Sequence, residues 1–189
     1  MIEPGAKIIG DRQNLLGTLG MFLKKRDEVY ILTSYHIIGN SEKVFFVDDA
    51  HGKYEIAKVC PEYGCSFFKV DYALAKLNPG VEYRRGYFDR GMSFQLEDGV
   101  ALSKIGATKK NTSGLVVGSD SEMLRIIRSY SEGGPPQVER MDYGAVWFFQ
   151  KNDVKYPVAL NISKGDRDGE VLASKLNMIM WYLTDFEVA

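Results

Sequence analysis

Two residues in the first half of the chain could together perform acid/base chemistry. His36 opens a short apolar turn after a predicted strand, and Asp71 stands directly before an alternating apolar strand. A buried aspartate that accepts a hydrogen bond from Nδ1 of a histidine fixes the tautomer of the ring and stabilises the imidazolium form. His36 is therefore a candidate general base, and Asp71 is the candidate carboxylate that orients it.

Each of these residues also has a plain structural interpretation. Alone, His36 would be a structural histidine and Asp71 would cap a turn. A third segment, Met141-Asp142-Tyr143-Gly144, lies further along the chain and leads into another apolar strand. The order of the three segments is what favours a shared site.

The elements that must position these residues are mostly strands. Short β-rich segments alternate with Gly, Asn, Asp and Pro turn signals, a pattern typical of a barrel or sandwich. The expected strands are 15–23, 29–33, 43–47, 53–60, 72–77, 100–105, 115–119, 125–128, 145–150 and 158–162.

One helix is expected, near the end of the chain. Its apolar residues recur at spacings of three and four and would form one stripe. Asp168 is the expected N-cap. We expect this helix to dock on the barrel, the alternative being an exposed helix that binds a partner. The stripe consists of Leu172, Leu176, Ile179, Met180 and Leu183.

In this order, the segments resemble motifs of the chymotrypsin/trypsin-like serine proteases, most closely the short bacterial and plant members. Thr33-Ser34-Tyr35-His36 matches Thr-x-x-His, and Asp71-Tyr72-Ala73-Leu74 matches Asp-x-Ala-Leu. Residues 141–144 stand where the family has Gly-Asp-Ser-Gly. Residues 102–116 resemble the Lys-x-Gly-x-x-Thr-x-x-Thr-x-Gly hairpin of the second barrel. The match runs from about residue 17 to residue 162.

The resemblance implies an all-β fold of two six-stranded antiparallel β-barrels with a C-terminal α-helix. Residues 1–82 would form the N-terminal barrel lobe, and 83–91 would connect the barrels. Residues 92–166 would form the second barrel lobe, and 167–189 the helix and tail. Together these parts would make one trypsin-like domain.

The resemblance breaks at the nucleophile. The family serine aligns with Tyr143, whose phenol oxygen lies too far from Cβ to replace the serine oxygen. Loss of the nucleophile costs about 10⁶ in kcat. The oxyanion-hole region comprises Met141, Asp142 and Gly144, and Met141 replaces a glycine whose N–H is one of its donors. Oxyanion donors are worth on the order of 10² to 10³ each.

Two further expectations concern this segment. The phenol of Tyr143 would bond to the imidazole of His36 and close the cleft. Asp142 aligns with a carboxylate that pairs with a freed N-terminal amine in activated family members. Here Asp142 is expected to be structural, bonding to local backbone or to an arginine such as Arg140.

Other nucleophiles and a metal are disfavoured. Ser129 and Ser131 lie in a Gly- and Pro-rich loop, and Cys65 matches no family nucleophile position. Cys60 and Cys65, with only His36 and His51 to support them, do not easily supply a four-ligand zinc site. No cofactor is expected.

Three functions compete. The first is a catalytically inactive protease homologue that binds a protein or extended peptide along a strand edge, or through loops 83–91 and 129–137. The second is an active serine endopeptidase with a non-standard nucleophile, or with Tyr143 substituted for a natural serine. The third is a small structural protein in which Cys60 and Cys65 would be bridged. The family resemblance also places Lys164 and Gly165 after the strand that lines the specificity pocket, suggesting a basic wall there.

Charge and composition narrow the partners. The 24 Lys and Arg against 25 Asp and Glu give a net charge of −1, which argues against a general polyanion binder. Arg84-Arg85 and Lys109-Lys110 are expected to be solvated loops, so no nucleic acid is predicted. The apolar stretch 176–183 is far shorter than the roughly 20 residues that cross a bilayer. Without a secretory signal pattern at residues 1–5, we expect a cytoplasmic protein.

Overall fold

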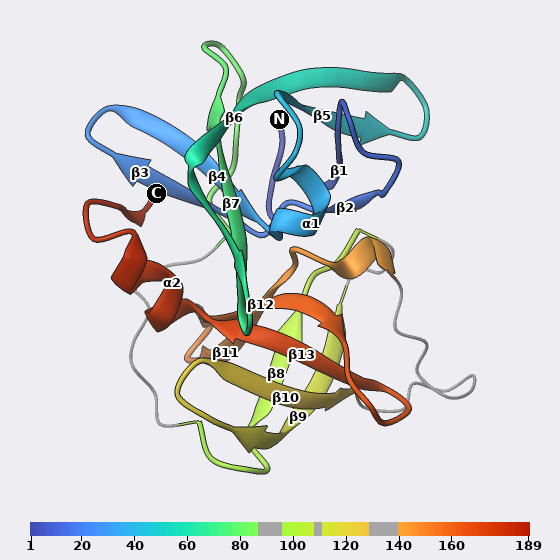
Figure 1. The fold of residues 1–189 in the computed structure, drawn as a ribbon, viewed down its shortest axis with the longest axis vertical. Coiled ribbons are helices and arrows are strands. Elements are labelled where there is room, and N and C mark those ends of the chain that lie inside the picture. Colours follow the sequence, from blue (N-terminus) through green and yellow to red (C-terminus); the bar gives the residue numbers. More distant parts are fainter. Residues whose placement is uncertain (87–95, 108–110, 129–139) are drawn as a thin grey trace.

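Two antiparallel β-sheets make up most of the molecule, one above the other in Figure 1. The structure, a computed structural model, describes residues 1–86, 96–107, 111–128 and 140–189. The expected connection 83–91 and the loop with Ser129 and Ser131 therefore lie partly or wholly outside the described residues. Lys109-Lys110 lies outside them as well.

The N-terminal sheet curls almost into a barrel. Its strand order is β14-β3-β4-β7-β6-β5-β1-β2. Only Leu19 and Gly20 separate β2, which pairs with β1, from β3, which pairs with β4. Residues 17–25 therefore bring the two sides of the sheet together as one sixth strand. The strands are β1 (Lys7–Gly10), β2 (Gly17–Thr18), β3 (Met21–Lys25), β4 (Glu28–Thr33), β5 (Lys43–Asp48), β6 (Gly52–Phe67), β7 (Val70–Leu77) and β14 (Glu187–Val188).

The second sheet is a closed six-stranded barrel with the order β10-β13-β12-β11-β8-β9. Its strands are β8 (Ala101–Lys104), β9 (Thr112–Ser119), β10 (Met123–Arg128), β11 (Val146–Lys151), β12 (Val154–Lys164) and β13 (Glu170–Lys175). Lys104 pairs with Thr112 in the β8–β9 hairpin, as the motif in residues 102–116 predicted. The predicted double-barrel fold is confirmed.

The C-terminal helix is shorter than expected. Helix α2 spans Leu176–Tyr182 with Lys175 at its N-cap position, so Asp168 as N-cap was wrong. Leu172 lies in β13, which pairs with both β10 and β12 and closes the barrel. Barrel closure therefore overrides a local helical spacing. The second lobe extends through β13, beyond the predicted boundary at residue 166.

A shared apolar cluster joins the two lobes. It includes Leu32 and Tyr72 from the N-terminal sheet, Val146 and Leu160 from the barrel, and Leu176 from α2. Burial raises the pKa of Tyr72 to about 12. Because the cluster draws on both sheets, packing fixes the lobes against each other. Among the described residues, no helix is long and apolar enough to cross a membrane.

Replacing Ile179 by alanine should lower the free energy of unfolding by about 2 to 5 kcal/mol, because its fully buried side chain packs in this cluster. Trp181→Ala on the exposed face of the same helix, where the side chain is 66% exposed, is the matched control and should cost much less. Urea denaturation of both variants measures the difference. Equal losses would contradict docking of α2 through Ile179.

Candidate active site

The carboxylate of Asp71 is the centre of the candidate site. Asp71 is the second residue of β7 and is buried. Its Oδ1 accepts hydrogen bonds from the hydroxyl of Ser34 at 2.8 Å and from the backbone N–H of Tyr35 at 2.5 Å. These two residues lead into the one-turn helix α1 (Tyr35–Ile38). Asp71 therefore holds the start of the turn that carries His36.

His36 is the second residue of α1, and its Nδ1 faces Oδ2 of Asp71 in an ion pair. The imidazole side chain remains 62% exposed, so its other nitrogen is accessible. This is the geometry of an oriented general base. Within the described part of the chain, the imidazole pairs with Asp71 alone, and the expected bond from the phenol of Tyr143 is not formed.

Tyr143 follows the 3-10 turn η1 (Arg140–Asp142). The backbone around it is held by the N-terminal lobe. The N–H of Thr18 donates to the carbonyl of Tyr143 at 2.9 Å, and its hydroxyl donates to the carbonyl of Met141 at 2.7 Å. The half-buried ring of Tyr143 packs against the apolar cluster of that lobe. The side chain is thus used for packing.

Gly144 brings segment 141–144 into close contact with segment 33–36, which carries His36. Its φ of +90° suits glycine, and a Cβ at this position would lie only 2.1 Å from the hydroxyl oxygen of Thr33. The same Cβ would be 3.2 Å from the backbone nitrogen of Ser34. The three sequence motifs therefore converge at one place, between the two lobes.

Asp142 is buried, as expected for a structural residue, and Lys104 from β8 is its partner. Both side chains of this ion pair are almost completely inaccessible. The ammonium of Lys104 also lies 5.6 Å from the centre of the Trp147 ring. The sequence pattern predicted local backbone or an arginine as the partner and did not indicate Lys104, whose motif predicts only a hairpin.

Met141 lies inside the 3-10 turn. Asn161 holds the far side of the segment, since its side chain donates to the carbonyl of Asp142 at 3.1 Å and its carbonyl accepts the N–H of Gly144 at 2.8 Å.

Two buried serines that the sequence analysis did not assign complete the site. Ser34 lies inside the Thr-x-x-His motif, so its position was a usable signal. Ser174 comes from β13, and its hydroxyl accepts the N–H of Asp71 at 3.2 Å and donates to the carbonyl of Lys69 at 2.7 Å. Nothing in its local sequence marks this contact between the lobes.

The turn next to Asp71 is also tied to the barrel. Lys69 and Asp120 form an ion pair at 2.5 Å. Burial alone would raise the pKa of Asp120, but Lys69 and two backbone N–H groups outweigh it and lower the pKa. The Asp71 end of β7 is therefore anchored across the lobes by both Ser174 and Lys69.

The remaining candidate residues are the two cysteines and the segment Lys164-Gly165. Cys60 and Cys65 are half-buried free thiols, and burial raises the pKa of Cys60. Lys164 is exposed at the end of β12. The charge buried beside Gly165 belongs to Glu170, an acid, so the suggested basic wall was wrong. Within the described ranges, no group of three or more His, Cys, Asp and Glu could hold a metal ion.

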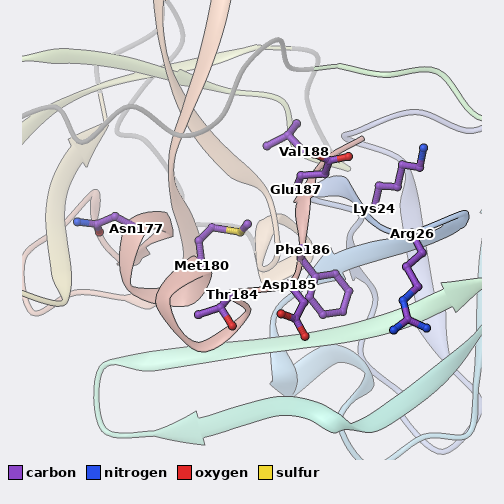
Figure 2. Close-up of a pocket in the computed structure, with 9 residues that line it drawn as sticks. All are labelled: Lys24, Arg26, Asn177, Met180, Thr184, Asp185, Phe186, Glu187 and Val188. Carbon is purple, nitrogen blue, oxygen red and sulfur yellow. The ribbon is translucent and has the colours of Figure 1, made fainter.

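A pocket of about 410 Å³ lies elsewhere, between α2, the C-terminal segment and β3. Figure 2 shows side chains of both charge signs around it. None of the candidate site residues lines this pocket. The lining residues are Lys24, Arg26, Asn177, Met180, Thr184, Asp185, Phe186, Glu187 and Val188.

Gly144→Ala should destabilise the protein more than Gly80→Ala. Both glycines have positive φ, +90° and +82°, but a Cβ on Gly80 meets nothing within 4 Å. Backbone strain of about 1 to 2 kcal/mol is shared by the two variants, so the excess in Gly144→Ala measures the close contact with Thr33. Thermal unfolding compares them, and equal losses would mean that the two lobes do not meet closely at Gly144.

Lys104→Met should cost about 3 to 5 kcal/mol of unfolding free energy, because it removes the buried cation paired with the carboxylate of Asp142. Lys76→Met removes an ion pair with Glu28 that is about half exposed, and should cost about 1 kcal/mol or less. Adding Asp142→Asn to Lys104→Met should restore part of the loss in denaturant titrations. Strictly additive effects of Lys104→Met and Asp142→Asn would contradict the pairing.

The chain matches no protein-family model and no curated protein. Solved structures do match it over its whole length. A glutamic acid-specific serine protease, described as using a novel histidine triad in substrate binding, has a TM-score of 0.71 at 18% identity, with 100% of both chains covered. An α-lytic protease homologue, N4, has a TM-score of 0.70 at 13% identity, covering 100% of this chain and 99% of that one.

Protease A of Thermobifida fusca gives a TM-score of 0.68 at 11% identity, covering 100% of this chain and 98% of that one. All three structures are similar to this chain in fold, at identities too low to transfer activity or specificity. The two β-sheets, the order of the three motifs and the full-length structural matches lead to the same conclusion. The chain has the double-barrel fold of the chymotrypsin/trypsin-like serine proteases.

Proposed function

We propose that the protein is a catalytically inactive homologue of trypsin-like serine proteases that binds an extended peptide or protein segment. The observation that carries the proposal is Tyr143 at the position of the nucleophile. Its backbone is held as the fold requires, while its ring packs on the N-terminal lobe. No serine hydroxyl is available at this position for His36 to activate.

The surroundings of Tyr143 support the same proposal. Met141, in the 3-10 turn before Tyr143, stands where the family has a glycine whose N–H is a donor of the oxyanion hole. Loss of oxyanion stabilisation costs on the order of 10² to 10³ in rate, separately from the lost nucleophile. Both changes act on the attack on the substrate carbonyl, and both would lower turnover.

A free strand edge supports the binding part of the proposal. Strand β12 continues beyond its last pair with β11, Leu160 opposite Val146. At its end, Ser163 and Lys164 pair with β13 on one side, and Ile162 lies at a register shift. Within the described ranges, nothing pairs with the other side, which adjoins the contact between Asn161 and Gly144. An extended peptide can add to such an edge through backbone hydrogen bonds.

A second candidate, an active endopeptidase with a non-standard nucleophile, is favoured by one observation. His36 and Asp71 keep the pairing of a working general base, and the imidazole is open to solvent. Turnover by the unaltered chain decides between the two candidates.

We expect the unaltered chain to release no fluorophore from a broad peptide library above background and to remain unlabelled by a fluorophosphonate probe. Met141→Gly combined with Tyr143→Ser should gain measurable turnover, because this pair of changes restores the hydroxyl and removes the side chain at the oxyanion position. Adding His36→Ala to that variant should lower kcat by at least about 10³, since the base acts only through the nucleophile.

The control is His36→Ala in the unaltered background, which should change nothing. Cleavage by the unaltered chain that His36→Ala abolishes would overturn the proposal and establish the endopeptidase. Cleavage that persists in His36→Ala would indicate a contaminating protease, to be removed before the comparison is repeated.

A further inference from the structure

Strand β6 carries both cysteines of the chain, on either side of a bulge. Cys60 lies opposite Leu74 of β7, and Cys65 lies opposite Tyr72. Residues 61–63 are the extra residues of the bulge, because Cys60 and Gly64 face neighbouring residues of β7. The bulge therefore brings the two cysteines as close as next-nearest neighbours on a regular strand.

This spacing falls within the range that a disulfide can bridge. Next-nearest neighbours on a strand have Cα atoms about 6.6 Å apart, at about 3.3 Å per residue. Disulfides usually join Cα atoms that are about 4.4 to 6.8 Å apart. The spacing lies near the upper end of this range, and the bulge is the part of the strand that can adjust to close the bond.

The two thiols also lie on the same face of β6. Leu74 and Tyr72 belong to the apolar cluster shared by the lobes, and both cysteines pack against this cluster. In the reduced chain the thiol of Cys60 donates to the carbonyl of Lys58 at 3.7 Å. Formation of a bridge to Cys65 therefore requires rotation of Cys60 about χ1, a change between staggered rotamers.

The surroundings of the bulge favour a bond within one chain. Cys60 and Cys65 are free and partly accessible, so a small oxidant can reach them. The ring of Tyr63 holds the bulge against the lobe, with its centroid 6.1 Å from that of Tyr30 and 5.0 Å from that of Phe186. A bulge anchored in this way keeps each thiol near the other, which raises the effective concentration for their reaction.

The pair lies next to the candidate site and apart from the edge of β12. Cys65 precedes Ser66, which is opposite Asp71 in the β6–β7 register. A bridge would therefore tighten the strand beside the carboxylate that faces His36. Neither cysteine belongs to the strand edge invoked for peptide binding, so the thiol pair goes beyond the proposed function.

We propose that Cys60 and Cys65 form a reversible disulfide within the chain on reaction with a low-molecular-weight disulfide such as oxidised glutathione. The thiolate of one cysteine attacks a sulfur of the oxidant and releases one reduced glutathione. The thiolate of the other cysteine attacks the protein sulfur of this mixed disulfide, forms the Cys60–Cys65 bond and releases the second glutathione. The two protein thiols lose two protons to the glutathione thiolates, and two electrons reduce the oxidant.

The test equilibrates the full, reduced chain in buffers of reduced and oxidised glutathione and stops the exchange with acid. Remaining thiols are labelled with N-ethylmaleimide, so intact mass separates reduced, glutathione-bound and bridged chains. Trypsin cuts after Lys58 and Lys69, which leaves both cysteines in one peptide, residues 59–69, for locating the bond. We expect an effective thiol concentration at least about tenfold higher in the folded chain than in a synthetic peptide 59–69.

Cys60→Ser and Cys65→Ser are the matched control variants. Each keeps one thiol and should stop at the mixed disulfide with glutathione, because no second thiol is present to displace it. Non-reducing electrophoresis distinguishes a bond within one chain from a bond between two chains. A bridge that the fold favours should also raise the Tm of the oxidised chain above that of the reduced chain.

Equal effective concentrations in the chain and the peptide would overturn the inference. It would equally be overturned by mixed disulfides or dimers as the only products, or by a bridged chain that melts below the reduced one. Peptide cleavage by the unaltered chain would overturn the inactive function and leave the thiol pair standing. The two failures are thus distinguishable.

Discussion

The buried carboxylate of Asp71 is the interaction on which the geometry of the site depends. Burying a charge is costly unless hydrogen bonds compensate for it. Here Ser34 and the N–H of Tyr35 bond to one oxygen, and His36 faces the other. The backbone of Asp71 is in turn held by Ser174 from the second barrel. One residue therefore fixes the turn that carries the histidine and its place relative to the other lobe.

This arrangement gives the His36–Asp71 pair a structural role that does not depend on catalysis. Asp71 would be needed for the fold even if the imidazole had no catalytic role, because its Oδ1 holds Ser34 and the N–H of Tyr35. In the segment around Tyr143, by contrast, the hydrogen bonds to the rest of the fold come from the backbone. Thr18 bonds to its backbone, and Gly144 makes the close contact with the first lobe. The backbone at position 143 is thus held without help from the side chain, which packs on the apolar cluster of the N-terminal lobe.

The sequence predicted the parts of the structure that depend on local pattern and on the order of motifs. Strand alternation and turn residues located most strands, and the three motifs met at one site. The predictions failed where the structure depends on closure of the barrel, which brings together strands that are distant in the sequence. Leu172 fits a helical stripe, yet the barrel needs its segment as strand β13. The Lys104–Asp142 pair and the role of Ser174 follow from barrel closure, which no local spacing encodes.

The second barrel buries two acids, Asp142 and Glu170, in different ways. Asp142 is neutralised by Lys104 inside the same barrel, so its charge is satisfied before any ligand arrives. Glu170 is fixed by two backbone amides and retains an oxygen without a partner. The two acids therefore show two ways of keeping a charge inside one barrel: a paired cation for Asp142, and backbone amides that fix the carboxylate over the turn for Glu170.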